Sequence, residues 1–406
     1  MFQVALKWFR TTYSKVITSI AFLPAIISLM FLGLSFLMIN FDFSETGKNI
    51  KANLHWLSLK DASTARSICS SIAGGIISLA VFSFSMVMIL LSQAAAQMSN
   101  RILGQLISNR FQQIVLGFYI GTIVYALFLL STIRDINTGI YVPAISTYLL
   151  IALTVVDIFL FIYFLHYITQ SVKFETIIHR IHDGTISALK KDCKMKTMPA
   201  AIPVAENGRV INAYKSGLYQ GFLKDSLQDL CKKENAVVFF LLPVGSYVME
   251  NTALLKVTCR KELSRDFEKK LSVAINIGRG QEISTSYYYG FRQLMEIAIK
   301  ALSPGINDPG TATISLQAIG DLLAHRLSHF PLAVFEDVDG ERRIVTKEKT
   351  FEEMFEEYLL PIWDYGKEDR LVQQEMLHIL TMLNGQRQEP VIDNLLKVVQ
   401  AARLKG

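Results

Sequence analysis

Four long apolar stretches at the start of the chain constrain its fold more than any other feature. Residues 16–41, 67–100 and 111–133 contain no charged side chain, and residues 136–172 contain one, Asp157. Each stretch is longer than the roughly 20 residues that a helix needs to cross a hydrocarbon core of about 30 Å. The sequence therefore predicts an α-helical membrane protein with a transmembrane domain in residues 1–169, whose four transmembrane helices span about 16–41, 67–98, 111–133 and 142–168.

The positions of lysine and arginine predict the orientation of the spans, because short loops rich in these residues stay in the cytoplasm. The N-terminal tail carries Lys7, Arg10 and Lys15 and no acid, and the loop between the second and third spans carries Arg101 and Arg110. The loop after the first span argues the other way, since it holds four basic residues, although three acids accompany them. On balance, we expect both termini to face the cytoplasm.

The net charge of +6 resides almost entirely in the membrane part. Residues 1–169 contain ten Lys or Arg and five Asp or Glu, which leaves 31 against 30 for the rest of the chain. A nearly neutral soluble region without a basic stripe argues against nucleic-acid binding. We therefore expect membrane lipids as partners and no nucleic acid.

The region after the fourth span predicts a cytoplasmic α+β region in three parts. Residues 170–199 have the pattern of an amphipathic linking helix, and residues 200–260 alternate short β-prone runs with turns. Residues 261–406 are mainly helical, with a hairpin candidate at residues 337–340. We expect a small β module followed by a helical bundle.

Within the expected β module, the segments 206–211 and 245–255 follow an order that resembles barrel-sandwich modules of the lipoyl and biotinyl type. Some modules of this type carry a modified lysine, but no such motif is evident in this sequence. We therefore expect a small barrel-sandwich-like β module that serves as a structural spacer or docking module.

Serine recurs every seven residues along the second span. The positions are Ser71, Ser78, Ser85 and Ser92, and Gly74 lies between the first two. Seven residues at about 100° each return to within roughly 20° of the same helix face, so the hydroxyls form one polar stripe. The stripe fits close helix packing, in which small residues let helices approach. It also fits a pore lined by successive rings of hydroxyls from symmetry-related copies, and an oligomer could combine both.

The third span carries Gly117 and Gly121, four residues apart. Small residues at this spacing lie on one helix face and let a neighbouring backbone approach closely. We therefore expect this face of the third span to pack against another helix.

Asp157 lies in the middle of the fourth span, where an acid is costly and usually faces the protein interior. No basic residue lies inside any of the four expected spans to pair with it. Three interpretations remain open: a role in ion or proton passage, a structural hydrogen bond, and a position nearer the membrane interface than the spacing suggests.

The most distinctive string after the spans is A-L-S-P-G-I-N-D-P at residues 301–309. Its prolines stop one helix, and Asn307, Asp308 or Thr311 can cap the next through a side-chain oxygen. One interpretation is a rigid corner between two helices. The others are a ligand or ion contact through Asn307 and Asp308, and a wedge at a subunit interface. The candidate residues of this signature loop are Ser303, Pro304, Gly305, Asn307 and Asp308.

With this string, the chain resembles an uncharacterised family of predicted bacterial membrane proteins, defined as a domain of unknown function, whose hallmark is an A-L-S-P-G-I-N-D-P run. Further strings look like the family's membrane motifs: I-A-G at 72–74, F-S at 84–85, Q-M-S-N-R at 97–101 and L-G-F-Y-I-G-T at 116–122. The resemblance covers most of the chain. It implies a multi-pass protein of the bacterial cell inner membrane and gives no reaction.

The sequence contains no motif of a known catalytic or metal site. It has no Gly-rich nucleotide loop after a strand, no H-E-x-x-H and no G-x-S-x-G. Cys69, Cys193, Cys231 and Cys259 are far apart and lie where thiols stay reduced, so we expect neither a disulfide nor a zinc site. We expect no enzyme activity, no catalytic residue, no metal and no cofactor.

An oligomeric inner-membrane channel or ion-permeation protein explains the serine stripe, Asp157 and the neutral cytoplasmic region together. We expect a homo-oligomer whose pore is lined by the second span. The alternative is a membrane-anchored sensor or scaffold whose cytoplasmic domain binds a partner or small ligand. A pore requires symmetric oligomers, whereas a sensor loses partner or ligand binding when the signature loop is altered.

Overall fold

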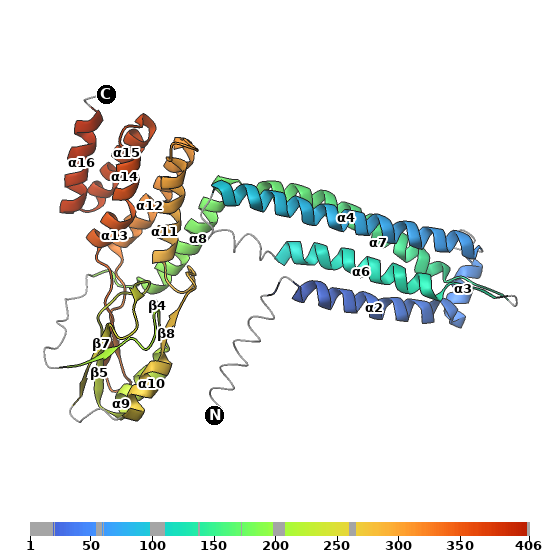
Figure 1. Ribbon diagram of the computed structural model, residues 1–406, viewed down its shortest axis with the longest axis horizontal. Coiled ribbons are helices and arrows are strands. Elements are labelled where there is room, and N and C mark those ends of the chain that lie inside the picture. The colour runs from blue at the N-terminus through green and yellow to red at the C-terminus, as the bar shows by residue number, and fades with distance from the viewer. Residues whose placement is uncertain are drawn as a thin grey trace. The chain divides into compact units, whose positions relative to one another are not determined.

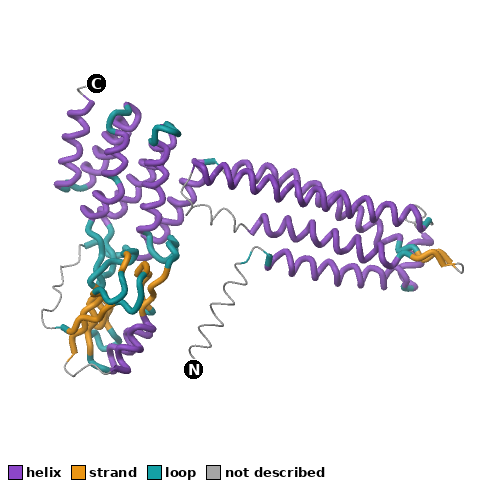
Figure 2. Tube along the Cα trace, viewed as in Figure 1, coloured by secondary structure: helices purple, strands orange, loops and turns teal. Residues whose placement is uncertain are grey.

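The computed structural model describes residues 19, 21–53, 59, 61–97, 110–136, 139–171, 173–197, 208–259 and 265–403. The chain divides into two compact units, a membrane unit up to Lys173 and a C-terminal unit from Phe174 (Figures 1 and 2). The basic N-terminal tail, the M-S-N-R part of the string at 97–101 and the expected turn at Asn207 lie outside the described residues.

Long helices form the membrane unit (Figure 1): α2 (Phe22–Phe43), α4 (Ala62–Gln97), α6 (Arg110–Thr132) and α7 (Ala144–Ser171). These four are long and apolar enough to cross a membrane. A short helix, α3 (Glu45–Asn53), follows α2, and the antiparallel pair β1 (Arg134–Ile136) and β2 (Gly139–Tyr141) lies between α6 and α7. α6 packs against each of the other three long helices and is the most buried of the four.

The outer faces of the membrane unit carry large apolar side chains. Leu29 of α2, Phe84 of α4 and Phe159 of α7 are 67%, 60% and 67% exposed. Soluble proteins rarely expose contiguous apolar surface on this scale, whereas lipid chains are as apolar as these side chains. The prediction of an α-helical membrane protein with four spans near its N-terminus is confirmed.

The glycines of α6 let α2 approach closely. A Cβ atom at Gly117 would stand 2.6 Å from Cδ1 of Ile27, and one at Gly121 would stand 2.7 Å from the ring of Phe31. Neither distance leaves room for a methyl group in a close-packed interior. The predicted packing face of the third span is confirmed, and its partner is α2.

The C-terminal unit combines two β-sheets with helices. Its first part contains α8 (Phe174–Asp192), β3 (Arg209–Asn212), β4 (Gly217–Phe222), α9 (Lys224–Lys233), β5 (Ala236–Phe240), β6 (Tyr247–Val248), β7 (Ala253–Cys259), α10 (Arg265–Ala274) and β8 (Ile275–Gly278). Its second part contains α11 (Tyr288–Ala301), α12 (Pro309–Ser328), β9 (Val334–Glu336), β10 (Arg342–Val345), α13 (Phe351–Tyr358), α14 (Leu360–Gly366), α15 (Arg370–Gln386) and α16 (Pro390–Arg403). The prediction of a mixed helical and β region after the spans is confirmed.

The larger sheet has the strand order β3-β7-β5-β10-β9, and the smaller has the order β6-β4-β8. Neighbouring strands are antiparallel except β5 and β10, which are parallel. The expected hairpin at residues 337–340 joins β9 to β10, with Gly340 at a φ of 77° that favours glycine.

This β region differs from the expected barrel-sandwich-like module in extent and in composition. β8, β9 and β10 lie beyond residue 260, so the sheets are not confined to residues 200–260. In addition, the segment between β4 and β5 forms the helix α9. Leu227 and Cys231, four residues apart, give this segment an apolar helix face. Both residues are buried in one core with Val238 and Phe240 of β5.

The helix expected to link the two regions is part of the C-terminal unit. α8 packs against α11 and α12. The contact with α11 is close, because a Cβ atom at Gly290 would overlap the side chain of Thr185. α8 is therefore packed against helices of the C-terminal unit and is not an isolated linker helix.

Candidate functional site

Most of the serine stripe lies on an exposed face of α4, while Ser92 at its end borders a cavity that α4 shares with α6. Ser71, Ser78, Ser85, Ser92 and Gly74 are all exposed. No described atom lies within 4 Å of the position that a Cβ at Gly74 would take. The buried face of α4 is instead formed by other small residues, among them Ala65, Cys69 and Ala73. Among the described residues, the part of the stripe from Ser71 to Ser85 is therefore not covered by another helix.

Two hydroxyls of the stripe, those of Ser78 and Ser85, are bonded to their own helix. Ser78 donates to the carbonyl oxygen of Gly74 at 3.0 Å, and Ser85 donates to that of Val81 at 2.9 Å. Such bonds to the carbonyl four residues earlier satisfy the hydroxyl hydrogen and leave the oxygen lone pairs free to accept. The stripe is thus compatible with a lipid surface, and it can also accept hydrogen bonds from water.

A second group of polar side chains lies inside the membrane unit, where α4, α6 and α7 meet. Asp157 of α7, Thr122 and Tyr119 of α6, and Ser83 of α4 are all buried, the first three completely. Four oxygen atoms of this group have no hydrogen bond of normal geometry among the described residues. They are the two carboxyl oxygens of Asp157 and the hydroxyl oxygens of Thr122 and Tyr119. We refer to these four residues as the Asp157 cluster.

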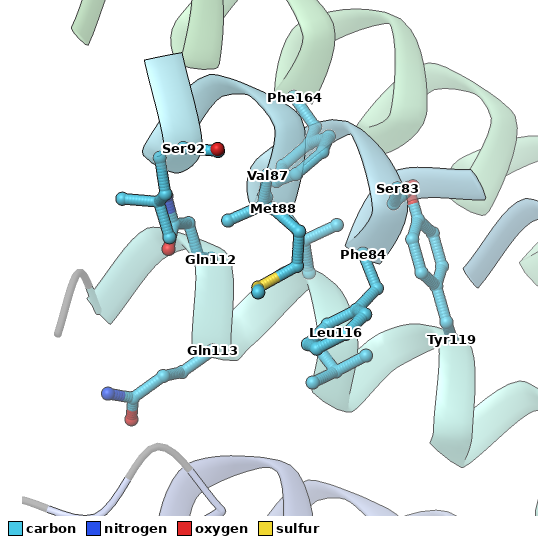
Figure 3. A pocket seen from close by; sticks show the side chains of 12 residues that line it. Ser83, Phe84, Val87, Met88, Ser92, Gln112, Gln113, Leu116, Tyr119 and Phe164 are labelled. Atoms are coloured by element: carbon cyan, nitrogen blue, oxygen red, sulfur yellow. The ribbon is translucent and has the colours of Figure 1, made fainter. Parts of the chain in front are cut away.

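The members of the Asp157 cluster face one another. The Thr122 hydroxyl is the hydrogen-bonding side chain directed at the Asp157 carboxyl, although the pair does not reach the geometry of a normal hydrogen bond. The Tyr119 hydroxyl lies beside Ser83, as Figure 3 shows, and is a neighbour of the Asp157 carboxyl. Buried polar groups are nearly always paired, so four unpaired oxygens in one place are unusual for a protein interior.

Sequence reasoning identified Asp157 but not the residues around it. Tyr119 and Thr122 both fall in the L-G-F-Y-I-G-T string at 116–122, which was singled out only as a motif. The signal that could have identified Tyr119 and Thr122 is that both are polar side chains inside an apolar span. Their meeting with Asp157 depends on how α6 and α7 pack, which the sequence does not give.

A cavity of about 420 Å³ lies along α4 and α6 (Figure 3). Its walls are mostly apolar, with polar groups at Ser83 and Tyr119 and at Ser92, Gln112 and Gln113. Ser83 and Tyr119 also belong to the Asp157 cluster, so one end of the cavity adjoins that cluster. Ser92 lies nine residues further along α4, which corresponds to about 13 Å of helix.

The signature loop forms a tight corner between α11 and α12. Asp308 is the N-cap of α12: its carboxyl accepts from the backbone N–H of Thr311 at 3.1 Å and from the hydroxyl of Thr311 at 2.6 Å. Asn307 has a φ of 49°, in the left-handed region that asparagine tolerates better than most residues. Ser303 donates its hydroxyl to the carbonyl of Lys300 at 2.6 Å.

Pro304, Gly305 and Asn307 form the exposed side of this corner. No described atom lies within 4 Å of the position that a Cβ at Gly305 would take. The hydrogen bonds within the corner account for the polar groups of Ser303 and Asp308 without a ligand.

The cysteines are free thiols, and three of them are buried. Burial raises the pKa of the Cys193 thiol to about 11 and that of the Cys231 thiol to about 12, so both are protonated at neutral pH. Among the described residues, no group of three or more His, Cys, Asp or Glu side chains is arranged to hold a metal ion.

These features define a helical membrane protein with four transmembrane helices and a mixed α/β C-terminal unit. Comparison of the sequence with known protein families gives the same class of protein. The chain belongs to the family described as "Predicted membrane protein (DUF2254)", which it matches over residues 17–382.

Curated relatives occur in mycobacteria. An uncharacterized protein of Mycobacterium tuberculosis and one of Mycobacterium bovis are each 26% identical to the chain over 341 residues, which covers 79% of this chain and 64% of theirs. The chain thus spans about 64% of the length of these relatives. No solved structure matches it significantly.

Proposed function

We propose that this protein is an oligomeric inner-membrane channel or ion-permeation protein whose pore is lined by α4. The observation that carries the proposal is the outward position of Ser71, Ser78, Ser85 and Ser92 together with Gly74. A stripe of small polar residues that no described helix of its own chain covers from Ser71 to Ser85 is suited to meet the same stripe of another copy. Small residues let helices of two copies approach closely.

The chemistry of the stripe supports a pore rather than a dry contact. Residues 67–97 carry no charged side chain, so a pore lined by this face would not trap an ion by charge. The lone pairs of Ser78 and Ser85 remain available after their hydroxyls bond to the helix. Successive rings of such oxygens would offer hydrogen-bond partners to water and ligands to cations.

The length and burial of α4 also support this role. Its 36 residues correspond to about 54 Å of helix, more than the roughly 30 Å of a hydrocarbon core. In addition, only 11% of its apolar span is buried within the chain, the lowest share among the four spans. A central helix of an oligomer has both properties, because it projects beyond the membrane and completes its burial against other copies.

The test is imaging of the full chain in lipid nanodiscs, followed by ion flux into vesicles. A closed ring with the stripe facing the axis is expected, and Ser85→Phe should reduce flux at least about tenfold by blocking the axis. Val155→Phe is the matched control, because Val155 is an exposed residue of α7 outside the stripe. A monomer, or flux that is unchanged in Ser85→Phe, would refute the proposal.

The proposal includes a bacterial inner membrane, membrane lipids as partners, and both termini in the cytoplasm. A membrane-impermeant maleimide tests the orientation in intact cells. It should label Glu45→Cys, whose native side chain is 88% exposed after α2, and should not label Val338→Cys, where Val338 is 89% exposed in the C-terminal unit. The reverse labelling pattern would invert the orientation.

The alternative proposal is a membrane-anchored sensor or scaffold. The exposed tip of the signature loop, Pro304, Gly305 and Asn307, favours it as a contact surface. A sensor would lose a bound partner or small ligand when Asn307 is replaced by a bulky residue, while flux through the membrane unit would be absent in every variant.

A further inference from the structure

Among the described residues of the membrane unit, two acids are completely buried, Asp42 and Asp157, and they differ in their partners. The carboxyl of Asp42 lies 3.2 Å from Nζ of Lys51 and accepts from the N–H of Ser146 at 2.7 Å. The carboxyl of Asp157 has no ion pair and no hydrogen bond among the described residues. A buried carboxylate in a membrane protein requires a compensating partner, because hydrocarbon does not solvate charge.

Two hydroxyls beside Asp157 also lack partners. Oγ1 of Thr122 and Oη of Tyr119 are buried, and neither has a hydrogen bond among the described residues. Thr122 is the hydrogen-bonding side chain directed at the carboxyl, and Tyr119, which lies beside Ser83, is a neighbour of the same carboxyl. With the two carboxyl oxygens, α6 and α7 thus present four buried oxygen atoms that lack a hydrogen bond of normal geometry among the described residues.

We infer that Asp157, Thr122 and Tyr119 form a binding site for a small monovalent cation within a single chain. Oxygen ligands suit hard cations, and one positive charge balances one carboxylate. A divalent ion would leave an unbalanced charge in the membrane interior. A proton on Asp157 is the competing way to neutralise the carboxyl, because the neutral carboxyl still accepts a hydrogen bond from a hydroxyl, and the pH arm of the test distinguishes the two.

The cavity along α4 and α6 provides the route to this site. It adjoins the cluster at Ser83 and Tyr119 and carries polar groups at Ser92, Gln112 and Gln113. Between these polar groups, its walls include Met88 and Leu116. An apolar middle slows the passage of ions by favouring the loss of water, so we expect the site to fill more slowly than an open one.

The cation site lies outside the proposed pore. It is built from α6 and α7 inside one bundle, whereas the proposed pore uses the exposed face of α4 and requires several copies; the cavity that leads to the site reaches the stripe only at Ser92 among its lining residues. Cation binding to a monomer without flux would therefore leave this inference standing while the proposed function fails.

The test is thermal unfolding of the full chain in detergent at constant ionic strength. The buffer contains N-methylglucamine chloride, which is replaced stepwise by LiCl, NaCl or KCl. The midpoint temperature of unfolding is recorded at each concentration. At least one of these ions should raise the midpoint in a saturable way, on the order of 5 °C when its concentration is a hundredfold above its Kd.

Variants of the cluster connect the shift to these residues. Asp157→Asn should abolish the ion-dependent shift, and Thr122→Val should weaken the apparent affinity about tenfold, as expected when one oxygen ligand is lost. Tyr119→Phe tests the third residue and should also weaken the ion-dependent shift. If Asp157→Asn does not fold, Tyr119→Phe and Thr122→Val together test the site. Glu45→Gln is the control, because its exposed side chain lies outside the cluster and should leave the shift unchanged.

The outcomes separate a cation site from its competitors. A saturable shift that is lost or weakened in the cluster variants supports the inference. No shift with any of the three ions, or an equal shift in Asp157→Asn and Thr122→Val, overturns it. Stabilisation by lower pH that disappears in Asp157→Asn, without any effect of the three ions, also overturns it and assigns the carboxyl to a proton alone.

Discussion

The carboxyl of Asp42, at the end of α2, accepts hydrogen bonds from the backbone N–H and the hydroxyl of Ser146 at 2.7 and 2.6 Å. Ser146 lies in the first turn of α7, so α7 is capped by a residue 104 positions earlier in the chain. Helix N-termini carry unpaired N–H groups and a partial positive charge, which a carboxylate satisfies. Asp42 therefore joins the first and fourth spans and orients α7, the helix that carries Asp157.

Removal of this cap should destabilise the membrane unit. Asp42→Ala is expected to lower its free energy of unfolding by about 3 kcal/mol, because Lys51 and the first turn of α7 lose a buried charged partner. Thermal unfolding in detergent measures the effect. Glu45→Ala, which removes an exposed pair with Lys48, should change stability by less than about 0.5 kcal/mol.

The two kinds of glycine in the spans should respond differently to a methyl group. Gly121→Ala is expected to destabilise the bundle by about 1–3 kcal/mol, because the new Cβ meets the ring of Phe31. Gly74→Ala should leave the monomer as stable as the original, since no described atom lies near that position. Equal losses in both variants, measured by unfolding of the monomer, would contradict the packing described for α2 and α6.

The signature loop should be sensitive at its cap and tolerant at its tip. Asp308→Ala is expected to reduce the stability of the C-terminal unit by about 1 kcal/mol, because the N–H of Thr311 loses its acceptor. Asp308→Asn should retain most of this stability, since asparagine also caps helices. Gly305→Ala is the tolerant control. Chemical unfolding followed by circular dichroism distinguishes the three variants.

Glu348 predicts a pH dependence of stability. Burial raises the pKa of Glu348 above its ordinary value of 4.5, although the Tyr288 hydroxyl donates to its carboxyl at 3.2 Å and partly offsets that rise. Because the folded protein holds the proton more tightly than the unfolded chain, this contribution to stability is complete below pH 4.5 and is lost as the pH rises through the folded pKa.

Glu348→Gln should therefore gain stability relative to the original protein as the pH rises above about 4.5. The measurement is the difference in thermal midpoint between the two proteins across a pH series. Glu352→Gln, at an exposed position of α13, should follow the original protein at every pH. A Glu348→Gln profile parallel to the original one would show that this carboxyl does not titrate differently on folding.

The sequence predicted the spans because a helix in lipid needs only length and apolarity, which are local properties. The expected spans differ from the helices chiefly at their ends. For example, the second was expected from residue 67, but α4 begins at Ala62, capped by Asp61, whose carboxyl accepts from the N–H of Thr64 at 2.9 Å. The close packing of Gly121 was also predictable from spacing, but its partner, Phe31, was not.

The β region was less predictable, because its sheets assemble from distant segments. β5 was evident as an apolar run, yet its parallel neighbour β10 comes from residues about a hundred positions later. Sequence spacing gives no signal for such pairing, since it depends on the path of α11 and α12 between them. The resemblance to a barrel-sandwich module also overlooked α9, whose apolar face repeats every four residues.

The sequence by itself determined that four helices cross a membrane, that serines share one face of α4, and that one acid lies inside a span. Composition and helical periodicity are sufficient for those statements. Only the tertiary structure decided that the serines face outward, that Asp42 is paired while Asp157 is not, and that Tyr119 and Thr122 stand beside Asp157. The reason is that the direction of a helix face and the partners of a buried group depend on the rotation and packing of neighbouring helices, which no single segment encodes.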